Sequence, residues 1–416
     1  MKNSRSRPSR RLALSAVLSA FAVVAPLSAQ PASPAPGAEW PVITPDELTP
    51  GQQGYGLTVL SGSEPVRFEV EVVGVMRNVT PGMTYILARL SGHGIEDTGV
   101  AGGMSGSPVF IDDRLAGAVA FAWPFSRDAI AGITPIDAMR QVGGAGGAVS
   151  GTLPAAGAAP ATLAELVSGE VPADLLARSL ERWRPALAGG ALPGIQWSLA
   201  GFGERSHALL AASLGAVAPA GTSLGATGGD AAAVLPDLAR GSAVSAVLVD
   251  GDLRLAATGT VTDLTGDRVL AFGHPFLGLG PIEVPMASAE VVTVISSEYS
   301  SFKIANLGPI VGAFDQDRQA AIAGRLGAEA AMIPLRLTVD GAERRDYRMR
   351  VARVPQMTPA LIAISALAGL DSASHAGGLQ GLDLTARFRL AGHGDLLVEQ
   401  SFDGETAAMS TASYLM

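Results

Sequence analysis

A serine between glycines is the residue of this sequence best suited to covalent chemistry. The segment from Gly102 to Pro108 reads Gly-Gly-Met-Ser-Gly-Ser-Pro, so Ser105 is predicted on a tight turn before a strand, with Asp112 and Asp113 turning a hairpin after it. On such a turn the serine Oγ is exposed and neighbouring N–H groups can face a developing oxyanion, as acyl transfer requires. The same spacing also fits a glycine-rich hairpin entrance without chemistry, and spacing alone leaves both interpretations open.

A serine nucleophile needs a proton acceptor, and two histidines compete for that role. His274 follows a predicted apolar strand ending at Phe272, and Pro275 restricts the backbone directly after it. His93 is the competitor, because it lies twelve residues before Ser105 in a Gly-His-Gly sequence. A turn histidine whose ring is satisfied by backbone groups is the alternative reading of His274.

The two segments together resemble a known family. The serine segment is similar to the Gly-Asp-Ser-Gly-Gly-Pro loop of chymotrypsin-like serine proteases. It is closer to the stage IV sporulation protein B (SpoIVB) peptidases, which carry Gly-Met-Ser-Gly-Ser-Pro. The stretch from Gly259-Thr260 to Gly273-His274 resembles the histidine segment of the same peptidases. This resemblance implies that Ser105 is the nucleophile, that Gly103 and Ser105 supply the oxyanion-hole N–H groups, that His274 is the base and that Ser107 is structural.

The chain departs from that family in its order and in its acid. In the sporulation peptidases the histidine precedes the serine, whereas here Ser105 precedes His274, so the two blocks are permuted. Triads are defined by geometry and not by chain order, so permutation is compatible with catalysis.

The third member of a triad has three candidate readings. The family's acid lies a short way before its serine, where this chain has none, and Asp97 lies closer to Ser105 than that pattern asks. Asp317 follows His274 by 43 residues, a separation similar to that in chymotrypsin-like barrels. Asp317 equally fits a surface carboxylate paired with Arg318, and a dyad without a buried acid is the third reading.

Short strands must position these residues, and the chain reads as two strand-rich blocks. Residues 46–145 carry the serine and residues 236–330 the histidine, with alternation such as Arg67 to Val73 typical of half-buried strands. Residues 146–235 are an Ala/Gly-rich linker and small α/β insert, and residues 331–416 a β-rich C-terminal domain. The predicted fold is therefore mainly β, a chymotrypsin-like double β-barrel assembled from two permuted blocks.

Composition excludes several other functions. The 416 residues carry a net charge of −9, which argues against nucleic acid as a partner. The chain has no cysteine, so disulfides, zinc thiolates and iron–sulfur clusters are excluded. Its five histidines form no HExxH motif, and we expect neither a metal nor another cofactor.

The amino terminus has the layout of a secretory signal peptide. A basic start from Lys2 to Arg11 precedes an almost wholly apolar or small run from Leu12 to Leu27, and small residues follow up to Ala29. We expect a signal peptide over residues 1–29, a Pro-rich linker over 30–45 and no membrane span in the mature chain. An uncleaved membrane anchor is the alternative, although the apolar run is short for one.

These patterns lead to one functional expectation and one alternative. The leading expectation is a secreted or periplasmic serine endopeptidase that acts on envelope or secreted proteins or on itself, with Ser105, His274 and Asp317 as its triad. The alternative is a catalytically silent barrel that binds peptides or scaffolds the envelope. An esterase of the α/β-hydrolase type is excluded, because a hairpin and not a helix is predicted after the serine.

Overall fold

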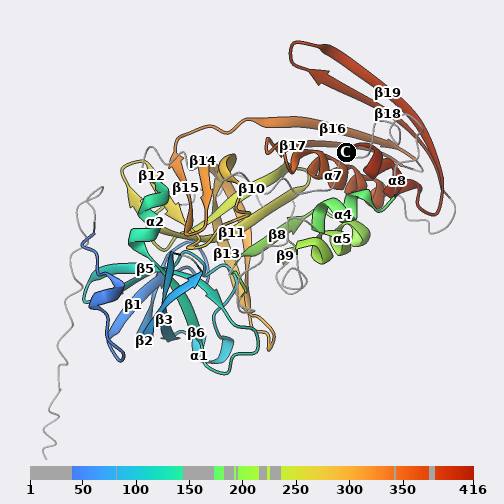
Figure 1. Ribbon diagram of the computed structural model, residues 1–416. Helices are drawn as coiled ribbons and strands as arrows, with labels where there is room; N and C mark the ends of the chain where they lie inside the picture. Colours follow the sequence, from blue (N-terminus) through green and yellow to red (C-terminus); the bar gives the residue numbers. More distant parts are fainter. Residues whose placement is uncertain are drawn as a thin grey trace, which may run out of the picture. The chain divides into compact units, whose positions relative to one another are not determined.

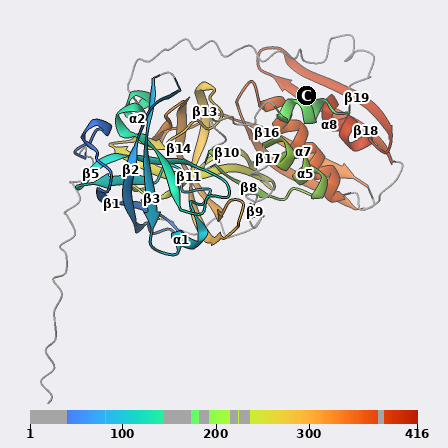
Figure 2. The ribbon, with the colours of Figure 1, turned by 60° about the horizontal axis from the view of Figure 1, so that its bottom comes forward.

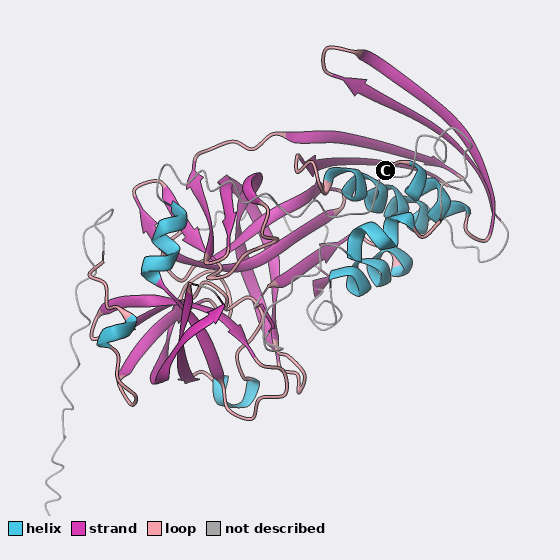
Figure 3. Cartoon of the chain, in the orientation of Figure 1, coloured by secondary structure: helices cyan, strands magenta, loops and turns pink. Residues whose placement is uncertain are grey.

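The protein is described by a computed structural model that covers most of the chain. The described residues are 40–80, 82–143, 173–181, 192–193, 195–214, 223–224, 236–341, 343–373 and 380–416. The expected signal peptide, residues 30–39 of the expected linker, and most of the Ala/Gly-rich linker lie outside them. The fold is mainly β, as the sequence predicts (Figure 3), and strands make up 53% of the described residues. Among the described residues, no helix combines the length and apolar character needed to cross a bilayer.

Six antiparallel strands around the serine segment close into a barrel, the serine barrel. Their order is β4-β1-β2-β3-β6-β5, and a β4–β5 pairing completes the ring. The strands, blue to teal in Figure 1, are β1 (Gln53–Thr58), β2 (Val66–Thr80), β3 (Met83–Ser91), β4 (Pro108–Ile111), β5 (Arg114–Ala122) and β6 (Ile130–Pro135). The short helices of this part are η1 (Pro45–Glu47), α1 (Ile95–Thr98) and α2 (Ile136–Gly143).

Local sequence explains the serine barrel. In β2, Phe68, Val70 and Val72 are buried while Glu69 between them is exposed, which confirms the predicted period-two strand. Asp112 and Asp113 both have positive φ angles, 50° and 55°, and join β4 to β5. Such angles match the twist of a tight hairpin, and aspartate tolerates them better than most residues. The hairpin predicted after Ser105 is therefore present.

A second antiparallel sheet contains another six-membered ring, the histidine ring. Its pairings run β10-β13-β14-β15-β12-β11 and return from β11 to β10. These strands are β10 (Ala243–Gly251), β11 (Arg254–Thr265), β12 (Arg268–Ala271), β13 (Gly280–Ile295), β14 (Phe302–Arg318) and β15 (Ala321–Leu326). With the serine barrel, this ring gives a roughly double-barrel architecture.

The insert and the tail extend the two sheets. In the serine barrel, β7 (Leu192–Pro193) pairs with β5. In the second sheet, β8 (Gln196–Ala200) pairs with β11 on one side and with β9 (Ser223–Leu224) on the other. At the opposite end of that sheet, β17 (Arg344–Ala352) pairs with β10 and with β16 (Met332–Asp340). The last strands, β18 (Gln380–Leu390) and β19 (Gly394–Gly404), pair only with each other among the described strands. The tail is thus partly a continuation of the histidine ring.

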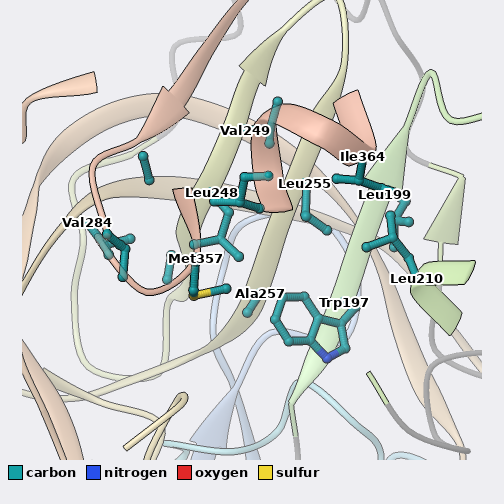
Figure 4. Close-up of a cluster of buried hydrophobic side chains, with 14 of the residues drawn as sticks. Trp197, Leu199, Leu210, Leu248, Val249, Leu255, Ala257, Val284, Met357 and Ile364 are labelled. Carbon is teal, nitrogen blue, oxygen red and sulfur yellow. The ribbon is translucent and has the colours of Figure 1, made fainter. Parts of the chain in front are cut away.

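Four helices share one core with these added strands. They are α4 (Leu175–Glu181), α5 (Glu204–Leu214), α7 (Thr358–Ala373) and α8 (Ala407–Tyr414). Figure 2 shows α7 beside α5, α8 and the β16–β17 hairpin, as its contacts require. Trp197, Leu210, Leu255, Met357 and Ile364 meet in this core (Figure 4). The tail is therefore not purely β-rich, because α7 alone spans 16 residues.

Backbone groups of the serine turn bond directly to the histidine ring. Thr260 donates its N–H to the Ser105 carbonyl at 2.8 Å and its Oγ1 to the Gly103 carbonyl at 2.9 Å. Thr262 donates its Oγ1 to the Gly106 carbonyl at 2.7 Å. We call residues 103–106 with residues 259–273 the barrel contact.

A buried ion cluster supports the barrel contact beside it. The Asp263 carboxylate, whose side chain is only 3% exposed, accepts hydrogen bonds from Arg140 on α2 and from Arg240. Two guanidinium groups on one desolvated carboxylate compensate its charge, so the cluster ties α2 of the serine barrel to β11.

Gly106 is required at the barrel contact for two reasons. Its φ of +93° is a conformation that side chains disfavour. A Cβ at this position would lie 2.0 Å from the Thr260 carbonyl oxygen and 2.5 Å from the Phe272 nitrogen. Both neighbours are backbone atoms, so a side chain here would separate the two rings.

We expect Gly106→Ala to lower the free energy of unfolding by more than about 3 kcal/mol, because strain and the clash add. Gly266→Ala is the matched control, since Gly266 also has a positive φ, +59°, but open space around its Cβ position. The control should cost about 1–2 kcal/mol from strain alone. Urea unfolding of both variants measures the difference, and equal losses would contradict the close approach.

Candidate active site

Ser105 lies on the turn that leads from α1 into β4. The turn is held by Gly102, whose N–H donates to the Ser301 carbonyl at 2.7 Å and whose carbonyl accepts from the Lys303 N–H at 3.0 Å. Gly103 has a φ of +91°, so glycines with positive φ flank the Met104–Ser105 pair. The predicted glycine-dependent turn is therefore confirmed in its backbone. The prediction that the serine Oγ is exposed is wrong, because Ser105 is only 1% exposed.

Ser105 lines a cleft that we call the serine cleft. Three segments form most of its walls, namely residues 98–102, 119–126 and 297–301. Phe121, Trp123, Phe125 and Tyr299 bring aromatic rings to it, and the Phe125 and Tyr299 rings lie 5.1 Å apart. The cleft next to the candidate nucleophile is thus largely apolar.

His274 carries a buried imidazole. It follows Phe272 and Gly273, which have φ angles of 73° and 70° and turn the chain after β12. The ring is 2% exposed, and burial lowers the pKa of His274 to about 4. Its Nδ1 lies 2.7 Å from the Pro275 carbonyl, which only accepts, so Nδ1 carries the proton and Nε2 the lone pair. Nε2 has no hydrogen-bond partner among the described residues.

The structure brings the serine turn and the histidine turn together without joining their side chains. Gly106 donates its N–H to the Val119 carbonyl at 2.7 Å, and a Cβ on Gly273 would lie 2.9 Å from the same oxygen. The two turns therefore meet at one point of β5. Because Nε2 has no described partner, Ser105 Oγ and His274 are not hydrogen-bonded in this conformation.

Asp317 is buried next to the histidine turn but binds backbone. Its carboxylate accepts from the N–H groups of Phe276, Leu277 and Leu279 at 2.7, 2.8 and 3.1 Å. Desolvation raises the pKa of Asp317, and the side chain is not the surface carboxylate of the alternative reading. It holds the loop after His274, whereas His274 Nδ1 is bonded to Pro275.

The other two candidates for base and acid lie away from the cleft lining. His93 is exposed, with a φ of 53°, and its Nε2 lies 3.1 Å from the Arg67 carbonyl. Asp97 is exposed on α1. Neither residue lines the serine cleft, and His274 does not line it either.

The oxyanion donors expected from the resemblance lie in the same turn. Gly102 and Met104 donate their N–H groups to carbonyls, but the Gly103 N–H has no described acceptor. Ser107 is fully buried, and its Oγ lacks a described partner as well. The turn thus holds a donor of the type that an oxyanion hole uses.

Lys303 is a further ionisable group at this turn, and the sequence reasoning missed it. Its side chain is fully buried, and its Nζ donates to Thr58 Oγ1 at 2.7 Å. The stem covers Gly103, where a Cβ would lie 3.1 Å from Lys303 Cδ. Burial lowers the pKa of Lys303 to about 7.

A sequence signal for Lys303 did exist. Of the 29 lysine and arginine residues, only Lys2 and Lys303 are lysines. Arginine stays protonated when buried, whereas lysine can become neutral, so the single lysine that follows the basic amino terminus is a candidate for a desolvated position.

Comparison with known proteins finds no match: no family model, no curated protein and no solved structure matches this chain. Within the part of the chain that the structure describes, no group of three or more His, Asp and Glu side chains could hold a metal ion.

For Asp317 we expect a structural effect on the loop after His274. Asp317→Asn should lower the free energy of unfolding by about 1–3 kcal/mol, because the amide nitrogen cannot accept from the loop N–H groups. Amide hydrogen exchange of Phe276 to Leu279 should accelerate. Asp267→Asn, at a 60% exposed side chain, is the control and should change neither quantity. Unchanged exchange in Asp317→Asn would contradict this role.

Lys303 should make stability depend on pH. The unfolded chain binds this proton up to about pH 10.5 and the folded chain only up to about 7, so stability rises with pH between these values. We expect Lys303→Met to raise the free energy of unfolding at pH 7 by on the order of 3 kcal/mol and to flatten this rise.

Denaturant unfolding at a series of pH values measures the effect of Lys303. The control is Lys303→Arg, which keeps its proton and should be less stable than the wild type throughout. If Lys303→Met leaves the slope between pH 7 and 10 unchanged, the amine is not desolvated.

Proposed function

We propose that this protein is an exported serine endopeptidase that uses Ser105 as nucleophile and His274 as base. The observation that carries the proposal is the meeting of two glycine turns, one bearing the serine and one a neutral imidazole with an unpartnered Nε2. A buried neutral imidazole is in the protonation state that a general base requires.

The proposed reaction is acyl transfer through Ser105. Ser105 Oγ attacks the peptide carbonyl carbon while its proton passes to His274 Nε2, and the oxyanion accepts hydrogen bonds from the N–H groups of Gly103 and Ser105. Collapse breaks the C–N bond, and His274 returns the proton to the leaving amine. A water molecule then hydrolyses the acyl-enzyme by the same steps.

This mechanism requires His274 Nε2 to reach Ser105 Oγ. Catalytic hydrogen bonds are often absent before substrate binds and form in the Michaelis complex. No described carboxylate bonds the imidazole, and the Pro275 carbonyl takes the place of the orienting acid at Nδ1. The proposed unit is therefore a dyad oriented by backbone, with Asp317 holding the loop.

The serine cleft suggests the kind of substrate. Its aromatic and small apolar lining favours a peptide with an apolar side chain next to the scissile bond. Export is proposed from the basic and apolar start of the sequence, which directs the mature chain to the periplasm or the medium.

The second candidate function is a catalytically silent barrel that binds peptides. The absence of a Ser105–His274 hydrogen bond and of a described carboxylate on the imidazole favours it. Such a protein would use the same apolar cleft without turnover.

A fluorophosphonate probe separates the two functions, because it reacts only with an activated serine beside an oxyanion hole. We expect it to label Ser105 and expect Ser105→Ala to abolish labelling. His274→Ala should slow labelling by about 10³-fold. Intact-mass and peptide mass spectrometry locate the adduct.

Ser107→Ala is the matched control for this experiment, because its hydroxyl lies two residues away on the same turn and should leave labelling unchanged. Circular dichroism of each variant checks that the fold persists. A folded protein that the probe leaves unlabelled would favour the silent barrel.

A further inference from the structure

The β18–β19 hairpin forms a sheet of its own among the described strands. Each strand has 11 residues, and no third strand among the described residues pairs with either of them. A two-stranded sheet is marginally stable by itself, and its open edges present unpaired N–H and C=O groups. The hairpin is therefore a candidate for pairing with another chain.

One face of the hairpin is apolar and only partly covered. Leu382, Phe388, Leu390 and Leu396 share this face, and Leu382 packs near the core while α8 contacts both strands. At the other end Leu390 is 46% exposed and Leu396 is 49% exposed. The apolar face is thus covered at its base and open near the turn.

The opposite face of β18 carries charges in a self-complementary order. Asp383 precedes the strand centre at Thr385, and Arg387 follows it at the same spacing. In an antiparallel pair of two β18 strands centred on Thr385, each Asp383 faces Arg387 of the other copy. Opposite charges at directly opposed positions stabilise such a pair.

The other open edges are less suitable for self-pairing. The same face of β19 carries Asp395, Glu399 and Asp403 and no basic residue, so two copies would oppose carboxylates. The β16 edge contains Pro334, which lacks the N–H that a ladder needs. Charge and backbone chemistry therefore single out β18.

We propose that two copies of this protein pair through β18, antiparallel and centred on Thr385, to form a four-stranded sheet in a two-fold dimer. Both apolar faces lie on the same side of that sheet. Leu390 of one copy comes opposite Gln380 of the other, near the end of the hairpin that α8 covers. The exposed Leu390 and Leu396 of each copy thus lie beside the end of the other copy's hairpin that α8 covers.

A charge exchange tests this dimer. We expect the full mature chain to sediment as a dimer. Asp383→Arg alone and Arg387→Asp alone should each weaken dimerisation by about tenfold or more, because each opposes like charges twice in a two-fold pair. An equimolar mixture of the two variants should form a heterodimer, since every opposed pair is again attractive.

Sedimentation velocity of each variant and of the mixture gives the oligomeric state, and circular dichroism checks folding. Glu399→Arg is the control, because this residue lies on β19 outside the proposed contact and should leave the dimer intact. A monomeric wild type would overturn the proposal. Dimers that persist in both single variants, or a mixture that stays monomeric, would overturn it as well.

Discussion

Backbone-to-backbone approach at Gly106 is the constraint on which the arrangement of this protein depends. Hydrogen bonds from Thr260 and Thr262 reach carbonyls of the serine turn only because no side chain stands between the two rings. On one side of the contact Gly106 has no Cβ that would block the approach. On the other side Gly259 has none either, and a Cβ there would lie 2.6 Å from the Phe272 ring. The position of Ser105 relative to His274 follows from these few atoms.

Desolvation near this contact decides the charge of its ionisable groups. His274, Lys303 and Asp317 are each almost completely buried, and none of them has an ion-pair partner among the described residues. Burial without a counter-ion favours the neutral form of each group, with Asp317 compensated by the N–H groups that it accepts from. By contrast, Asp263 has two ion-pair partners, Arg140 and Arg240. The barrel contact therefore has desolvated ionisable groups without ion pairs close to it and a two-arginine ion pair at its margin.

The sequence predicted what depends on local pattern. Alternation in β2, the aspartate turn after β4 and the glycine turn at Ser105 are encoded within a few residues, and all three are present. Each of these features can be predicted without knowing which distant residues it contacts in the fold.

Features that depend on distant partners were not predicted. The position of Asp317 in the chain suggested an acid, but its partners are backbone groups about 40 residues earlier. Lys303 carries no motif, and only its rarity marks it. The helix α7 was missed because its apolar residues surround it on all sides, so they show no face by which to recognise a surface helix.

The order of the two rings along the chain has a consequence for its synthesis. The last strand of the serine barrel ends at Pro135. Its hydrogen-bond partners in the histidine ring come later in the chain, and Thr260 follows its partner Gly103 by 157 residues. Contacts within each ring are short in sequence, and those between the rings close a long loop. The serine barrel can thus fold while the ribosome is still translating, and docking of the histidine ring comes late. Until that ring has been made, the nascent chain holds the serine turn without the His274 that the proposed mechanism requires, so the proposed nucleophile would stay inert during synthesis.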